Sequence, residues 1–90
     1  MLTKEQIKTL IENDPHFVEL IEIHFDIRET RKCFRDTLTL LRNIKHPAEK
    51  LDVIYDEYRG KEEQSELHIE NVYGVTRHDY GFIEKELNLG

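Results

Sequence analysis

Gly74 separates two segments that each have helical spacing, and this constrains the last third of the chain. Before it, Ile69 and Tyr73 are four residues apart and share one helix face. Gly74 suits the end of that helix, because glycine adopts the left-handed conformation at low cost. After it, Thr76 and Asp79 have capping-box spacing, and an apolar face follows at Tyr80, Ile83 and Leu87. The pattern predicts two short helices joined by a tight turn.

The segment from Ser65 to Leu87, in which Ser65 is the expected N-cap, resembles a helix-turn-helix unit. Within that class it is most similar to region 4 of bacterial sigma factors and to sigma-like phage transcription activators. The resemblance covers about a quarter of the chain. One position departs from the pattern, because Glu70 follows Ile69 where the family places a small residue. The residues that carry the resemblance are Ser65, Ile69, Tyr73, Gly74, Val75, Thr76, Arg77, Tyr80, Ile83 and Leu87.

The resemblance implies that the second helix reads DNA. In such units the first residues of this helix meet base edges, while neighbouring cations hold phosphates. It therefore implies base contacts by Arg77, His78 and Gly81, with Lys85 on a phosphate. The net charge of residues 76–90 is −1, which opposes attraction to the DNA backbone.

Strands are the alternative for two parts of the chain. Leu67 and Ile69 alternate with polar residues, as do the apolar residues of segment 21–27. A lone strand needs a partner, so the alternative is an α+β fold with a small antiparallel sheet formed by residues 20–28 and 66–87. We expect instead an all-α bundle of about five to six helices that ends in the helix-turn-helix.

Capping signals define the first two helices. Thr3 and Gln6 form a capping-box pair, so a helix is expected from about Lys4 to Glu12. Asp14 is the expected N-cap of the next helix and Pro15 its first residue.

The phase of the apolar residues shifts near Ile27, where Asp26 and Glu29 have cap spacing, so a new helix is expected there. Its predicted apolar arc contains Ile27, Cys33, Phe34, Leu38, Leu40, Leu41 and Ile44. Cys33 is thus expected to be buried as a small hydrophobe. The opposite arc carries what we call the basic stripe: Arg28, Arg31, Lys32, Arg35 and Arg42.

A further helix is expected after His46-Pro47, with an apolar stripe at Leu51, Ile54, Tyr55 and Tyr58. Gly60 and segment 61–64 then form an expected exposed connector. The whole gives a single domain, 1–90, in which helices 1–45 carry the basic stripe and 47–90 form the helix-turn-helix unit.

Charge is unevenly distributed along the 90 residues. The net charge is −4 over residues 1–27, +4 over 28–50 and −6 over 51–90. Such a chain is not a general nucleic-acid binder, and any DNA contact must be local. No apolar run approaches the ~20 residues of a membrane span, so no membrane association and a cytoplasmic location are expected.

No catalytic constellation is present in the sequence. The five histidines are scattered, and His24 is expected to be a partly buried, hydrogen-bonded residue and not a metal ligand. With one cysteine and no histidine pair at metal-binding spacing, we expect no enzyme activity, metal or cofactor.

Two functions remain open. The first is a small regulator that binds DNA, with the basic stripe on phosphates. The second is an acidic protein-binding module, such as an inhibitor, an antitoxin-like partner or a phage-encoded blocker of a host nucleic-acid enzyme. Its acidic face would be Glu62, Glu63, Glu66 and Glu70. The basic stripe could instead dock a partner or a second copy in a homodimer, or be neutralised by the chain's own acids.

Overall fold

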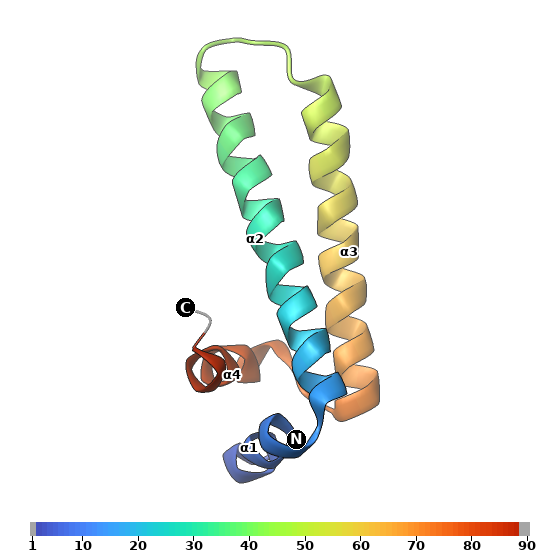
Figure 1. Cartoon of the computed structure of the whole chain (residues 1–90). Coiled ribbons are helices and arrows are strands. Elements are labelled where there is room, and N and C mark those ends of the chain that lie inside the picture. Colours follow the sequence, from blue (N-terminus) through green and yellow to red (C-terminus); the bar gives the residue numbers. More distant parts are fainter. Residues whose placement is uncertain (1, 89–90) are drawn as a thin grey trace.

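The computed structural model describes residues 2–88, and this part of the chain contains helices and no strand (Figure 1). The expected all-α class is confirmed, and the alternative sheet of 20–28 and 66–87 is wrong. The number of helices is smaller than the five to six expected, because two pairs of predicted helices are fused. The elements are α1 (Lys4–Asn13), α2 (Pro15–Asn43), α3 (Glu49–Tyr73), the 3-10 turn η1 (Arg77–Asp79) and α4 (Tyr80–Leu87).

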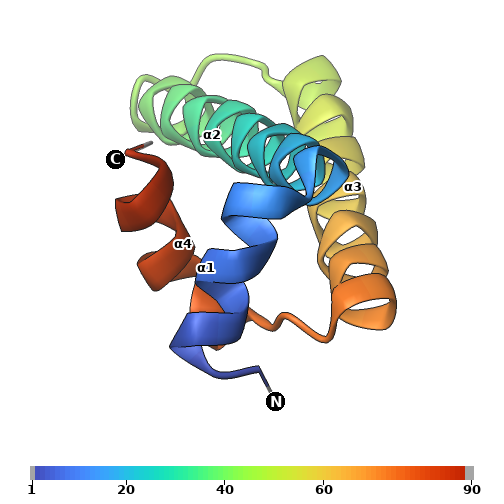
Figure 2. The ribbon, with the colours of Figure 1, turned by 60° about the horizontal axis from the view of Figure 1, so that its bottom comes forward.

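A long antiparallel hairpin of α2 and α3 forms the body of the molecule (Figure 1). The two short helices, α1 and α4, lie together at the end where α2 begins and α3 finishes (Figure 2). The overall dimensions are 49 × 23 × 20 Å. The molecule therefore has a compact head at one end and a two-helix arm at the other. None of the described helices is long and apolar enough to cross a membrane.

The expected caps of the first two helices are confirmed. The Thr3 hydroxyl accepts a hydrogen bond from the Gln6 amide at 3.2 Å, and the Gln6 side chain accepts one from the Thr3 amide at 2.8 Å. The Asp14 carboxylate accepts a hydrogen bond from the Phe17 amide at 3.1 Å, and Pro15 is the first residue of α2. These local signals were sufficient because each depends on residues within one turn.

The predicted helix start near Ile27 is wrong, because α2 continues from Pro15 to Asn43. The shift of apolar phase has a different cause. The first turns of α2 bury Phe17 and Ile21 in the head, whereas the far half buries Leu38 against α3. One straight helix thus turns different faces to different neighbours.

The predicted connector at 60–64 is also wrong, because α3 runs unbroken through Gly60 to Tyr73. Four good helix formers, Lys61 to Gln64, follow Gly60, which by itself costs only about 1 kcal/mol relative to alanine. Ser65 is consequently an interior helical residue and not an N-cap. The expected helix-turn-helix ending is not formed as a separate unit, since its supporting helix and its first helix are one element.

The turn at Gly74 agrees with expectation. Gly74 has a φ of 73°, in the left-handed region, and its amide donates to the Glu70 carbonyl at 2.8 Å. The Asp79 carboxylate then accepts a hydrogen bond from the Thr76 amide at 3.1 Å, which closes the start of η1. This turn directs α4 back across the head.

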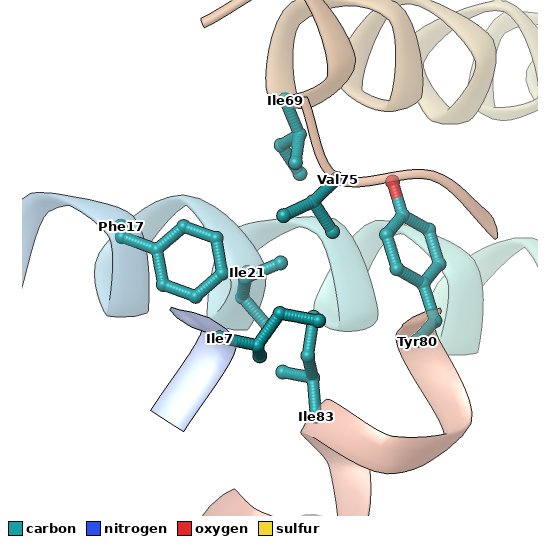
Figure 3. Packing of buried hydrophobic residues seen from close by; sticks show 7 residues of the cluster. All are labelled: Ile7, Phe17, Ile21, Ile69, Val75, Tyr80 and Ile83. Carbon is teal, nitrogen blue, oxygen red and sulfur yellow. The ribbon is translucent and has the colours of Figure 1, made fainter. Parts of the chain in front are cut away.

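The hydrophobic core lies in the head and draws on every helix (Figure 3). Phe17 packs edge-on against Tyr73, with ring centroids 4.9 Å apart, and so joins the start of α2 to the end of α3. The α4 helix contributes two buried side chains to this core. The buried residues of the cluster are Ile7, Phe17, Ile21, Ile69, Val75, Tyr80 and Ile83.

The arm is held by a thinner contact. Leu38 is buried and Phe34 lies against Tyr58 with ring centroids 5.5 Å apart. The rest of the predicted apolar arc of α2 is uncovered: Leu40 is 63% exposed and Ile44 65% exposed. The expected burial of Cys33 is wrong, because this thiol is exposed on the same uncovered face. Within residues 2–88, α3 is the helix that lies beside this half of α2 (Figure 1), and it covers part of the wide arc.

Candidate functional site

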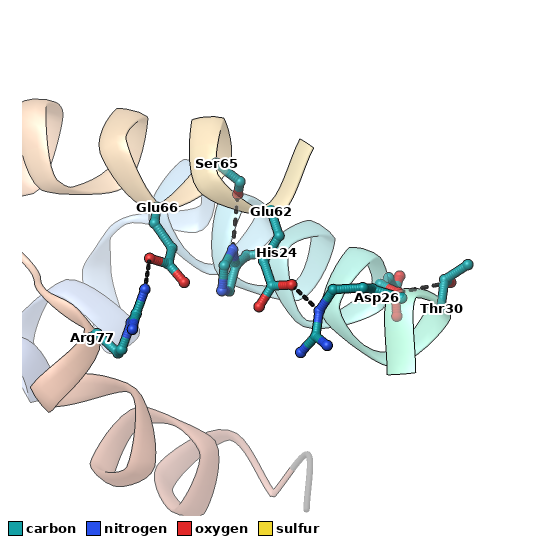
Figure 4. Close-up of polar contacts among 8 residues, drawn as sticks. His24, Asp26, Thr30, Glu62, Ser65, Glu66 and Arg77 are labelled. Carbon is teal, nitrogen blue, oxygen red and sulfur yellow. Dashed lines mark hydrogen bonds and ion pairs between the residues drawn. The ribbon is translucent and has the colours of Figure 1, made fainter. Parts of the chain in front are cut away.

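A polar cluster lies between α2 and α3 where the arm joins the head (Figure 4). Its centre is His24 of α2, which is 0% exposed. The Nδ1 atom of His24 lies 3.1 Å from the Ser65 hydroxyl on α3. The expected hydrogen bond of His24 is therefore confirmed, and its burial is complete where partial burial is expected. The second ring nitrogen, Nε2, has no hydrogen-bond partner in the described part of the chain.

Two carboxylates flank this imidazole, and each is held by an arginine. Glu62 and Glu66 are one helical turn apart on α3, with the His24 ring between them (Figure 4). Arg31 of α2 donates through Nε to Glu62 Oε2, and both side chains are mostly buried, at 16% and 14% exposure. Arg77 of η1 donates to Glu66 Oε2 at 2.9 Å. The cluster thus ties α2, α3 and η1 together.

Burial sets the protonation of the central groups. It lowers the pKa of His24 below its usual 6.5, more than the nearby carboxylates of Glu66 and Glu62 raise it. The imidazole is therefore neutral at pH 7. Burial also raises the pKa of Tyr80 to about 12, helped by the charge of Glu66. The Tyr80 hydroxyl is buried and lacks a hydrogen-bond partner within residues 2–88.

A cavity of about 220 Å³ opens on this cluster. Its walls come from α2, α3, η1 and α4, so no single segment creates it. Tyr80 closes one side, with its ring centroid 4.8 Å from that of His24. The lining residues are Arg28, Arg31, Glu62, Glu66, Arg77 and Tyr80.

The residues predicted to contact DNA bases lie at the outer edge of the head. Arg77, His78 and Gly81 are all exposed at η1 and the start of α4, and Lys85 is exposed further along α4. The Arg77 side chain is 77% exposed but is engaged by Glu66. The helix available for a groove, α4, has only eight residues.

The structure divides the basic stripe. Arg31 and Arg42 turn toward α3, where Arg31 pairs with Glu62 and Arg42 pairs with Asp52 at 2.7 Å. Arg28 and Lys32 are half-buried and line an open hollow with acidic residues of α2 and α4: Glu22, Asp26, Glu29 and Glu84. Arg35 is exposed and lies 3.5 Å from its neighbour Asp36. The stripe is thus largely opposed by carboxylates of the chain itself.

The predicted acidic face is divided as well. Glu62 and Glu66 are half-buried in the polar cluster, whereas Glu63 and Glu70 are exposed. Two further exposed acids of α3 continue the row of Glu63 and Glu70 at seven-residue spacing. We call this set the outer acidic line: Glu49, Asp56, Glu63 and Glu70. None of the four forms an ion pair within the described residues.

Sequence reasoning missed both arrangements for one reason. The outer acidic line and the set Glu62, Ser65 and Glu66 both have helical spacing, but a connector was placed at 60–64, and it split them between elements. Treating residues 49–73 as one helix would have put Glu62, Ser65 and Glu66 on one face. The partnership with His24, 38 residues before Glu62 in the chain, needs the hairpin itself.

No family model, curated protein or solved structure matches the chain.

Proposed function

We propose that the chain is a non-enzymatic protein-binding module that presents the outer face of α3 to a basic surface of a nucleic-acid-handling protein. The observation that supports this best is the outer acidic line. Its four carboxylates are exposed, unpaired within residues 2–88 and repeated every seven residues, so they stay near one face of a straight helix. They extend over about 30 Å of α3 at 1.5 Å per residue.

The same face offers apolar contact area. Val53 and Leu67 follow Glu49 and Glu63 by four residues, and their exposed fractions are 61% and 58%. A mixed row of carboxylates and aliphatic side chains suits a partner that carries both cations and apolar groups, since the charges steer the encounter and the apolar contacts hold it.

The distribution of cations supports this choice. Three of the arginines proposed for DNA, Arg31, Arg42 and Arg77, already pair with carboxylates of α3. Phosphate would have to compete with those carboxylates for the arginines, while the outer carboxylates repel the DNA backbone.

Affinity capture of a partner by the tagged 90-residue chain tests the proposal. The wild type should retain a basic protein that duplex DNA displaces. The double charge reversal Glu63→Lys, Glu70→Lys should abolish retention. A matched double reversal on α1, Glu5→Lys with Glu12→Lys, makes the same change in net charge and should leave retention intact. Equal retention by both variants would contradict the proposed surface.

DNA binding is the second candidate, and the exposure of Arg77, His78 and Lys85 favours it. It requires duplex binding at low salt that weakens steeply with added salt. Arg77→Ala should then relax sequence preference, whereas Lys32→Ala should weaken all sequences equally. Absence of duplex affinity at low salt would eliminate this candidate.

A further inference from the structure

We infer that His24, Glu62 and Glu66 form a binding site for one divalent transition-metal ion, with Zn²⁺ as the natural probe. One ligand atom from each of the three side chains lies within 4.8 Å of the others. Imidazole nitrogen and carboxylate oxygen are among the ligands that Zn²⁺ takes in proteins. The site joins α2 to α3 at the base of the arm, and its three ligands are not among the four residues of the outer acidic line.

The free nitrogen of His24 points to a ligand. This side chain is 0% exposed, and its Nε2 has no protein partner among the described residues. Burying an unpaired polar atom is costly, so a group that binds this nitrogen stabilises the fold. In Figure 4 the ring lies between the two carboxylates, which places Nε2 next to groups that share a metal readily.

Ser65 prepares the imidazole for this role. Its hydroxyl lies 3.1 Å from Nδ1 and can accept the Nδ1 proton, which leaves a lone pair on Nε2. Histidines that bind metals almost always donate their other nitrogen's proton to such a partner, because this fixes the tautomer and the ring orientation. The hydrogen bond from His24 Nδ1 to Ser65 therefore leaves Nε2 as the nitrogen that can bind a metal.

The two arginines support the carboxylates without occupying them fully. Arg31 and Arg77 each bond to Oε2 of their glutamate, so Glu62 and Glu66 each keep a second oxygen for the ion. The two carboxylates bring two negative charges to the ion, and Arg31 and Arg77 share these charges through their ion pairs. Hydrogen bonds to ligating carboxylates are the usual outer support of a metal site.

Binding one ion requires the three ligand atoms to move only slightly closer together. Two ligands at about 2.1 Å from a tetrahedral ion are roughly 3.4 Å apart, and the three ligand atoms here lie within 4.8 Å of one another. Rotation of the two flexible glutamate side chains can supply this movement. The cavity lined by Glu62, Glu66 and Tyr80 adjoins the cluster, so it has room for a water molecule as the fourth ligand of a tetrahedral ion.

Calorimetric titration of the metal-stripped full chain with Zn²⁺ is the first test. We expect one ion per chain, with affinity reduced at least about tenfold in Glu62→Gln and in His24→Gln. Glu57→Gln makes the same change at an exposed carboxylate of α3 away from the cluster and should bind as the wild type does. At a hundredfold excess over the dissociation constant, the melting temperature should rise by roughly 10 °C or more. Absence of binding by the wild type, or an equal loss in Glu57→Gln, would overturn the site.

A second measurement uses only the wild type and so does not depend on whether a variant folds. Long-range ¹H–¹⁵N correlation spectra report each imidazole nitrogen separately. Zn²⁺ should shift Nε2 of His24 while its Nδ1 remains protonated. Shifts confined to the other four histidines, His16, His46, His68 and His78, would show adventitious surface binding and refute the site. Neither result bears on capture through Glu63 and Glu70.

Discussion

The packing of α4 on the head yields a sharp test at Ile83. This side chain is 0% exposed and lies in the core with Ile7, Ile21 and Val75 (Figure 3). Shortening a buried isoleucine to valine costs about 0.5–1.5 kcal/mol, and shortening it to alanine about 2–5 kcal/mol. A domain of this length has a free energy of unfolding of roughly 5–13 kcal/mol. Ile83→Val should therefore stay folded, whereas Ile83→Ala should lose a large share of the free energy of unfolding.

Urea unfolding followed by circular dichroism measures both losses. We expect the midpoint to fall in the order wild type, Ile83→Val, Ile83→Ala, with an unchanged slope if α4 unfolds together with the rest. Leu40→Ala is the matched control, because Leu40 is aliphatic and helical but 63% exposed. Its effect should be within about 0.5 kcal/mol. Equal losses at the two positions, or no loss in Ile83→Ala, would refute the packing of α4.

Three further predictions concern other parts of the fold. Gly60→Ala should stabilise the chain by about 0.5–1 kcal/mol, since Gly60 is helical with open space around it. Gly74→Ala should destabilise the chain, because φ at this position is 73°. Thermal melts should therefore show opposite shifts of the melting temperature for the two variants. Without metal, the free energy of unfolding should decline as the pH falls below 6.5. Burial lowers the pKa of His24 in the folded chain, so the unfolded chain takes up the proton first. Urea unfolding should show a smaller decline in His24→Gln. Cys33 should react with a thiol reagent in the native state at nearly the rate seen in urea, because it is exposed; strong native protection would contradict this.

Local chemistry predicted local structure well. The capping box at Thr3, the Asp14–Pro15 start of α2 and the left-handed Gly74 all formed as expected. Each depends on groups a few residues apart, so the sequence alone contains the whole interaction. His24 also followed from its position on an apolar helix face.

Helix length could not be predicted in the same way. The apolar phase shift near Ile27 indicated a break only if one assumes that a helix keeps a single neighbour throughout. In α2 the neighbour changes from the head to α3, so a shifted phase is what a continuous helix requires. Gly60 was interpreted as the start of a connector, although one glycine is a small cost in a helix of 25 residues.

The candidate site was the part least accessible from sequence. The alternative protein-binding function assigns Glu62 and Glu66, with Glu63 and Glu70, to an acidic partner-binding face, but α2 places Arg31 and His24 against the first two. The family resemblance assigns Arg77 to DNA, yet its partner Glu66 lies across the turn. These pairings are set by the hairpin, and the hairpin was hidden by the predicted connector.

Residue-specific photo-cross-linking tests the proposed docking face most directly. Benzoylphenylalanine replaces Leu67 beside the outer acidic line, His78 at the start of the α4 region and, as a control, Glu12 on α1, all three of which are exposed. The protein-binding proposal predicts a cross-link to a basic protein from position 67 and none from position 12. Cross-linking to DNA from position 78, with none from position 67, would contradict it.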